Sequence, residues 1–94
     1  VNNEAQVRQL LNFIGDRPCV LAGDFNARPT EPPIALVRGS GRFVGEFDGP
    51  ATYPSDAPTQ RLDYVFAPAG WELIECKVIA DPASDHCPVV ARFR

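Results

Sequence analysis

The residues from Gly23 to Asn26 could carry out chemistry, because an acid and an amide stand two positions apart directly after a short apolar run. Asp24 supplies an anionic acceptor and Asn26 a neutral donor. Such a pair can hold a water molecule or a hard cation, and it can also bind a phosphate oxygen. The alternative is an Asx turn, in which these side chains only close the preceding strand. Both interpretations stay open from these residues alone.

A second acid, Asp63, stands inside an otherwise apolar strand pattern at residues 61–66. A carboxylate in that setting is costly unless it is paired, so we expect a partner for it. Arg61, two residues earlier on the same face of the strand, is one candidate. The other is His86, which is the only histidine of the chain and lies in the polar stretch 84–88. A carboxylate on an adjacent strand would fix the tautomer of His86 and favour its protonated form.

The loop from Thr52 to Gln60 leads directly into the Asp63 strand and is rich in proline and polar residues. It could line a substrate cleft, but we expect a surface connection for every residue except Tyr53. A nucleophilic serine in this loop or near the histidine would suggest a Ser-His-Asp hydrolase. The sequence has no Gly-x-Ser-x-Gly turn to present such a serine, so we discount that chemistry.

Two helices and several short strands must position these residues. Residues 4–14 carry apolar side chains at i, i+3, i+4 and i+7, which predicts an amphipathic helix that stops at Gly15. Residues 18–23 form a short apolar run, typical of a strand buried on both faces. A second helix is expected with Thr30 as its N-cap and an end before Gly39. Further strands are predicted at residues 42–47, 62–67, 72–80 and 88–93.

The composition restricts the class of protein. A length of 94 residues suits one small domain, and 45% hydrophobic with 22% charged residues excludes wholesale disorder. No apolar run approaches the roughly 20 residues of a membrane helix. The formal charge of −3 gives no global field that would attract nucleic acid. Three cysteines without a CxxC spacing argue against a disulfide framework or a zinc knuckle, and one histidine excludes a His-rich metal site.

Taken in order, three motifs resemble the endonuclease/exonuclease/phosphatase superfamily, the group related to pancreatic-type deoxyribonuclease. These motifs are Gly23-Asp24-Phe25-Asn26, Arg61-Leu62-Asp63-Tyr64 and Ser84-Asp85-His86-Cys87-Pro88. The resemblance implies an α/β fold, the four-layered sandwich of that family. Residues 1–94 would be its C-terminal half, with one mixed, largely antiparallel sheet and helices on one face. The N-terminal half, with the glutamate that is the principal metal ligand, would be missing.

The same resemblance implies a role for each site residue. Asp24 would position or deprotonate the attacking water, and Asn26 would hold a phosphate oxygen. Asp63 would orient His86, which would contact the scissile phosphate as an acid, a base or an electrostatic stabiliser. Asp85 would lie close to the metal, and Asp24 and Asn26 are further candidate ligands. Oxygen ligands beside a phosphate suit Mg²⁺ or Mn²⁺ better than zinc.

We therefore expect a divalent-metal-dependent phosphoesterase, with these 94 residues inactive without the missing half. The substrate class stays open between nucleic acid, phospholipid and small phosphodiesters. The alternative is a binding or structural module that keeps the phosphoesterase scaffold without the chemistry. Without its other half, the sheet would expose Val20, Val65, Val90 or their neighbours, and we expect the chain to self-associate as a two-fold homodimer.

Overall fold

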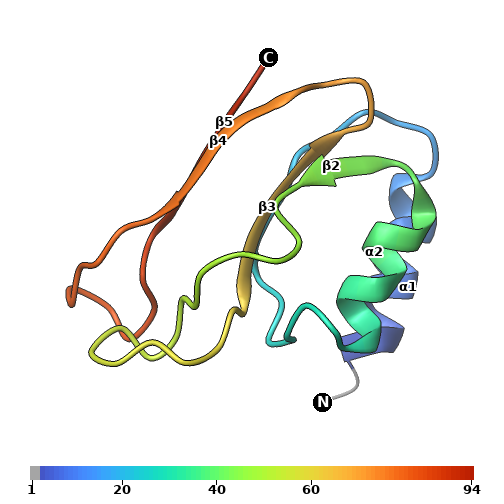
Figure 1. Cartoon of the computed structure of the whole chain (residues 1–94). Coiled ribbons are helices and arrows are strands. Elements are labelled where there is room, and N and C mark those ends of the chain that lie inside the picture. The colour runs from blue at the N-terminus through green and yellow to red at the C-terminus, as the bar shows by residue number, and fades with distance from the viewer. Residues whose placement is uncertain (1–2) are drawn as a thin grey trace.

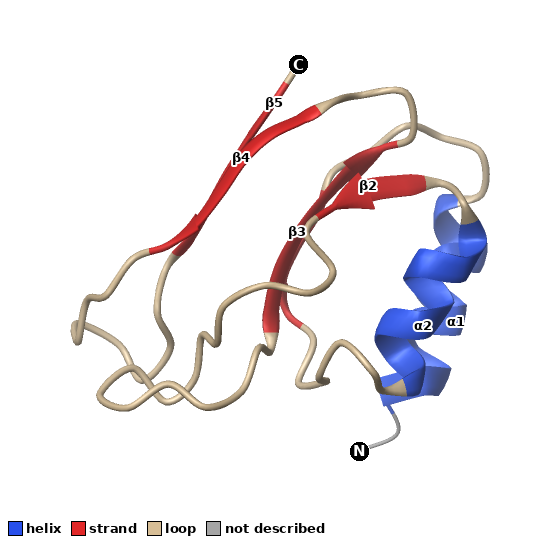
Figure 2. Cartoon of the chain, in the orientation of Figure 1, coloured by secondary structure: helices blue, strands red, loops and turns tan. Residues whose placement is uncertain are grey.

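A computed structural model describes residues 3–94, which form two helices and five strands (Figure 2). The α/β class is confirmed. Among these residues, no helix combines the length and apolar character needed to cross a membrane. The elements in chain order are α1 (Asn3–Ile14), β1 (Leu21–Asp24), α2 (Pro32–Ser40), β2 (Phe43–Gly45), β3 (Asp63–Pro68), β4 (Leu73–Val78) and β5 (Val89–Phe93).

The strands form two antiparallel sheets instead of the one mixed sheet that was expected. The larger sheet has the order β1-β3-β2, and β4 pairs only with β5. The physical reason is that β3 uses both of its edges, one for β1 and the other for β2. The β4–β5 hairpin therefore lies against a face of this sheet, whereas both helices lie on the opposite side, as expected (Figure 1).

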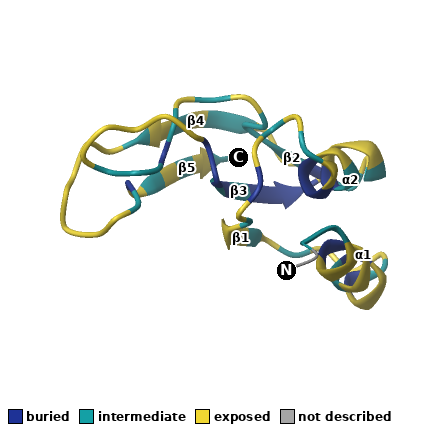
Figure 3. Ribbon diagram, turned by 90° about the horizontal axis from the view of Figure 1, so that it is seen from below, coloured by how far each residue is buried: buried dark blue, intermediate teal, exposed yellow. Residues whose placement is uncertain are grey.

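The core lies between the helices and β3. The apolar side of α1 that the periodicity predicts is buried, and the aromatic side chains of Tyr64 and Phe66 meet it from β3. Phe25 packs edge-on against both rings, with centroids 5.5 and 5.6 Å apart. Burial colours in Figure 3 show β3 as the most enclosed strand. Because each large apolar side chain buried here contributes about 1.5–3 kcal/mol, β3 is a rigid base for any group at its end.

The second helix differs from its prediction at both ends. Its N-cap is Glu31 instead of Thr30, and the Glu31 side chain makes no capping hydrogen bond. The helix continues through Gly39 and ends at Ser40, with Gly41 as its C-cap, whose φ of 69° lies in the left-handed region that glycine tolerates. The expected end before Gly39 is therefore wrong, because the left-handed conformation that ends the helix is adopted at Gly41.

The predicted burial of the first strand on both faces is wrong. Among the described residues β1 is an edge strand, and Ala22 and Asp24 are exposed. Val20 is 53% exposed and Val90 is 55% exposed. Val65, in contrast, is half-buried and lines the groove between the two sheets. Self-association stays a prediction, and it would use Val20 or Val90, since the three valines do not share one open surface.

Candidate active site

Two carboxylates meet where the β1–β3 ladder ends. Asp24 and Asp63 are the last partners of this antiparallel register, directly opposite each other. Opposite residues in such a pair point to the same face of a sheet, and this face is the one toward the β4–β5 hairpin. Like charges placed directly opposite destabilise a sheet. The position therefore requires a donor between the two acids.

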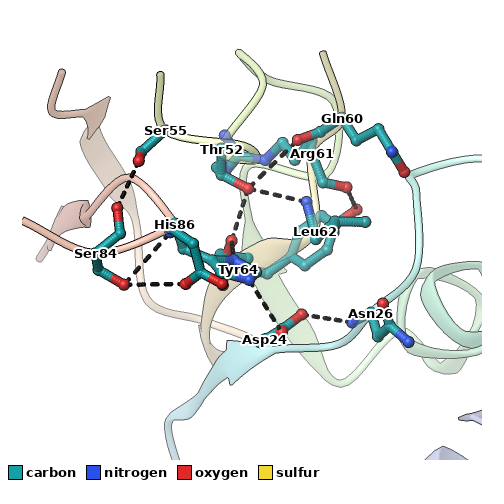
Figure 4. A network of polar contacts seen from close by, with 12 residues as sticks. Asp24, Asn26, Thr52, Ser55, Gln60, Arg61, Leu62, Tyr64, Ser84 and His86 are labelled. Carbon is teal, nitrogen blue, oxygen red and sulfur yellow. Dashed lines mark hydrogen bonds and ion pairs between the residues drawn. The ribbon is translucent and has the colours of Figure 1, made fainter. Parts of the chain in front are cut away.

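The imidazole of His86 is that donor. Its Nδ1 lies 2.7 Å from Oδ2 of Asp63, and its Nε2 lies 3.6 Å from Oδ2 of Asp24 (Figure 4). The hydrogen bond that His86 donates to Asp63, followed by the charges of Asp63, Asp24 and Asp85, raises the pKa of His86 above 6.5, while desolvation opposes this. His86 is thus held in one orientation, and its charged form is favoured relative to a free imidazole. Of the two predicted partners of Asp63, His86 is confirmed.

Arg61, the other predicted partner of Asp63, is used elsewhere. Its guanidinium is buried and forms an ion pair with Glu46 at 3.3 Å. It also donates a hydrogen bond of 3.1 Å to the carbonyl of Pro50. Arg61 therefore holds the loop before β3 and leaves Asp63 to the histidine.

The Asx-turn interpretation of Asp24 is also confirmed, but it accounts for only one of the two carboxylate oxygens. The backbone N–H of Asn26 donates to Oδ1 of Asp24 at 2.7 Å. Asn26 has a φ of 48°, so the strand alternation ends at Asp24 and the amide does not share its face. Figure 4 shows Asn26 on the other side of Asp24 from His86. The remaining oxygen, Oδ2, is the one that faces the imidazole.

Two further contacts anchor the loop that follows β1. The backbone N–H of Phe25 donates to the carbonyl of Leu62 at 2.9 Å. The hydroxyl of Tyr64 reaches the carbonyl of Ala27 at 2.8 Å, and burial raises the pKa of this phenol above its usual range. Both contacts join the loop to β3 or to Leu62, the residue directly before it. The position of Asp24 is thus tied to the strand that carries Asp63.

The segment that carries His86 is held by the loop at residues 52–60. The backbone N–H of Cys87 donates to the carbonyl of Thr52 at 2.7 Å, and the N–H of Ser55 donates to the carbonyl of Asp85 at 2.8 Å. The ring of Tyr53 packs against the imidazole with centroids 4.7 Å apart. The expectation of a surface connection, which excepted Tyr53, is therefore wrong at Thr52, whose side chain is buried.

Thr52 is the site residue that sequence reasoning missed. Its side chain is fully buried, and its Oγ1 lies 2.7 Å from Oδ2 of Asp63. The signal in the sequence was Asp63 itself, because a carboxylate inside an apolar strand is costly unless hydrogen-bond donors pair with it. A loop of threonines and serines that enters directly beside Asp63 can supply the second donor.

Asp85 lies outside the group of three ligand atoms. Its side chain is exposed, and Oδ1 accepts a hydrogen bond of 3.2 Å from the hydroxyl of Ser84. The three groups that come together are Asp24, Asp63 and His86, with one ligand atom of each within 4.8 Å of the others. Asp63 and Nδ1 already bind each other. Oδ2 of Asp24 lies outside the Asx turn and can bind either a hard divalent cation or a water molecule.

Comparisons with known proteins agree with this geometry. Residues 4–86 match the model of the Endonuclease/Exonuclease/phosphatase family. A solved structure, described as a functionally unknown conserved protein from Enterococcus faecalis V583, is similar with a TM-score of 0.78 and 23% sequence identity. The match covers 98% of this chain and 44% of that chain, so this sequence spans less than half of that protein. At this identity the likeness shows the fold alone. No curated protein matches the sequence.

Proposed function

The chain belongs to the endonuclease/exonuclease/phosphatase family, and from this premise we propose that it carries the acid–base groups of a divalent-metal-dependent phosphoesterase. Phosphoester hydrolysis needs an oriented water, compensation of charge on the phosphoryl oxygens and a proton for the leaving oxygen. Asp24 and His86 are the two groups that can meet these needs, and they lie side by side, with Oδ2 of Asp24 3.6 Å from Nε2 of His86.

The imidazole held between two carboxylates is the observation that supports this function. The hydrogen bond to Asp63 raises the pKa of His86 and so favours its charged form, and we assign His86 to the phosphoryl and leaving oxygens. Asp24 keeps one carboxylate oxygen outside its Asx turn, and we assign this oxygen to the attacking water. As water attacks phosphorus, its proton passes to Asp24. The ester P–O bond breaks, and the leaving oxygen takes the proton from Nε2 of His86.

A divalent cation completes the proposal. Mg²⁺ or Mn²⁺, when bound, would neutralise charge on the phosphoryl oxygens. Asp24 is the residue that would hold it, and the exposed Asp85 and Asn26, which lie outside the group of three ligand atoms, are the further candidate ligands. Mg²⁺ is commonly bound by one or two carboxylates together with waters and the substrate phosphate, and this donor set is of that kind.

We further propose that the active unit is larger than these 94 residues. The similar solved chain is more than twice as long as the part that matches, and Asp24 lies exposed on the edge strand β1. The 94 residues alone should then have little activity, and the rest of the domain would be their partner. The substrate is a phosphate ester of nucleic acid, of a phospholipid or of a small molecule, and the net charge of −3 does not favour nucleic acid.

The test is hydrolysis of bis(4-nitrophenyl) phosphate by a protein in which this sequence is joined to the rest of its domain. We expect activity with Mg²⁺ or Mn²⁺ and loss of activity with a chelator. Asp24→Asn and His86→Ala should each lower kcat by about 100-fold or more, the size of a lost acid or base.

Asp16→Asn is the matched control, because Asp16 is an exposed acid near the opposite end of β1. It should keep the unmodified rate. Rates equal to the unmodified protein in both Asp24→Asn and His86→Ala would instead indicate a module that keeps the scaffold without the chemistry.

A further inference from the structure

We propose that Thr52 is a positioning residue that fixes Asp63 and, through it, the orientation of His86. The expected effect of Thr52 on catalysis rests on the proposed function, whereas its effect on the orientation of His86 does not. The side chain of Thr52 is fully buried. Its Oγ1 lies 2.7 Å from Oδ2 of Asp63, the same oxygen that lies 2.7 Å from Nδ1 of His86 (Figure 4).

The direction of the Thr52 hydroxyl follows from its neighbours. The backbone N–H of Leu62 donates to Oγ1 at 3.0 Å, so the oxygen already accepts a hydrogen bond. The hydroxyl proton then has two acceptors within reach, Oδ2 of Asp63 at 2.7 Å and the carbonyl of Gln60 at 3.5 Å. The shorter contact to a charged acceptor is much the stronger. Thr52 therefore donates to Asp63.

The main chain of Thr52 binds the other member of the pair. Its carbonyl accepts a hydrogen bond of 2.7 Å from the N–H of Cys87, the residue after His86. Its own N–H donates to the carbonyl of Gln60 at 2.8 Å, which closes the loop on itself. One buried residue thus joins the strand of Asp63 to the segment of His86.

The chemical consequence concerns the histidine tautomer. The terminal torsion of an aspartate is broad, so a carboxylate with a single partner can rotate and exchange its oxygens. Two donors on Oδ2 hold Asp63 in one rotamer. The imidazole then keeps its proton on Nδ1 toward Asp63, and Nε2 stays directed at Asp24.

The experiment uses the ring ¹⁵N shifts of the 94-residue chain at a pH where the imidazole is neutral. The chain has one histidine, so the signals need no assignment against others. The unmodified chain and Thr52→Ser should show the Nδ1–H tautomer, whereas Thr52→Val should show a mixture of both tautomers. Thr59→Val is the matched control, since Thr59 is an exposed threonine of the same loop. The Nδ1–H tautomer in Thr52→Val would overturn the proposal.

Thr52→Val leaves the N–H of Leu62 without its acceptor, and amide spectra will show whether it folds. If it does not, the hydroxyl proton of Thr52 in the unmodified chain decides. We expect this proton to be protected from exchange and coupled in space to Asp63, and rapid exchange would overturn the proposal. These readouts need no activity, so they stand if the phosphoesterase proposal fails. In the active protein, Thr52→Val should lower kcat by about 10- to 100-fold with KM nearly unchanged, and Thr52→Ser should restore it.

Discussion

Asp24 and Asp63 stand directly opposite each other at the end of the β1–β3 ladder, and both carboxylates point at the same imidazole. A sheet that places two acids in one cross-strand pair is destabilised unless a donor lies between them. His86 supplies that donor from a segment 23 residues after Asp63. His86 therefore serves both the stability of the sheet, as the donor between the two acids, and the proposed chemistry.

The pKa of His86 should depend on its two acids to different degrees. Its hydrogen bond to Asp63 is the main cause of the raised pKa, and the charge of Asp24 is a smaller one. We expect the pKa to be highest in the unmodified chain, lower in Asp24→Asn and lowest in Asp63→Asn. An NMR titration of the single histidine measures this order. A pKa in Asp63→Asn equal to that of the unmodified chain would contradict the assigned geometry.

The histidine should stabilise the fold more in mild acid than in mild base. Because the pKa of His86 is raised on folding, its contribution is fully present below its unfolded value near 6.5 and is lost as the pH rises through the folded value. His86→Gln should therefore lower the free energy of unfolding more at a pH of about 5.5 than at about 9. Urea unfolding at both values tests this, and an equal loss at the two values would argue against the ion pairs.

The Tyr64 hydroxyl should contribute to stability independently of the histidine. It holds the loop after β1 through the carbonyl of Ala27, so Tyr64→Phe should lower the free energy of unfolding by about 1 kcal/mol. The loss should be the same on both sides of neutral pH. Tyr53→Phe is the control, because no hydrogen bond of its hydroxyl is found among the described residues, and its effect should stay within about 0.5 kcal/mol. Equal losses in the two variants would remove the anchoring role of Tyr64.

Self-association should depend on the strand surface. Val90 is 55% exposed on β5, and Phe13 is 73% exposed on α1, across the molecule from the β4–β5 hairpin. We expect sedimentation velocity to show a concentration-dependent dimer that Val90→Glu weakens and Phe13→Glu leaves unchanged. A monomer at every concentration, or equal effects of the two glutamates, would refute association through the strands.

Much of this fold could be predicted from local pattern. The apolar period of residues 4–14 predicts the buried side of α1, and each predicted strand overlaps one that the structure contains. The sequence also indicated that Asp63 needs a partner, because burying an unpaired carboxylate in an apolar strand costs free energy of folding. The histidine was the natural candidate, since its charge and tautomer respond to a nearby acid.

The order of motifs and the chemistry of single side chains are properties of the chain itself, so the sequence determined the family and the need of Asp63 for a partner, while Arg61 and His86 both stayed open as that partner. The register that sets Asp24 opposite Asp63, the burial of Thr52 and the division into two sheets depend on distant segments meeting. No local pattern records which edges of β3 are already paired or which hydroxyl of a polar loop reaches a buried acid. Only tertiary packing decides these, because it alone brings residues 24, 52, 63 and 86 to one place.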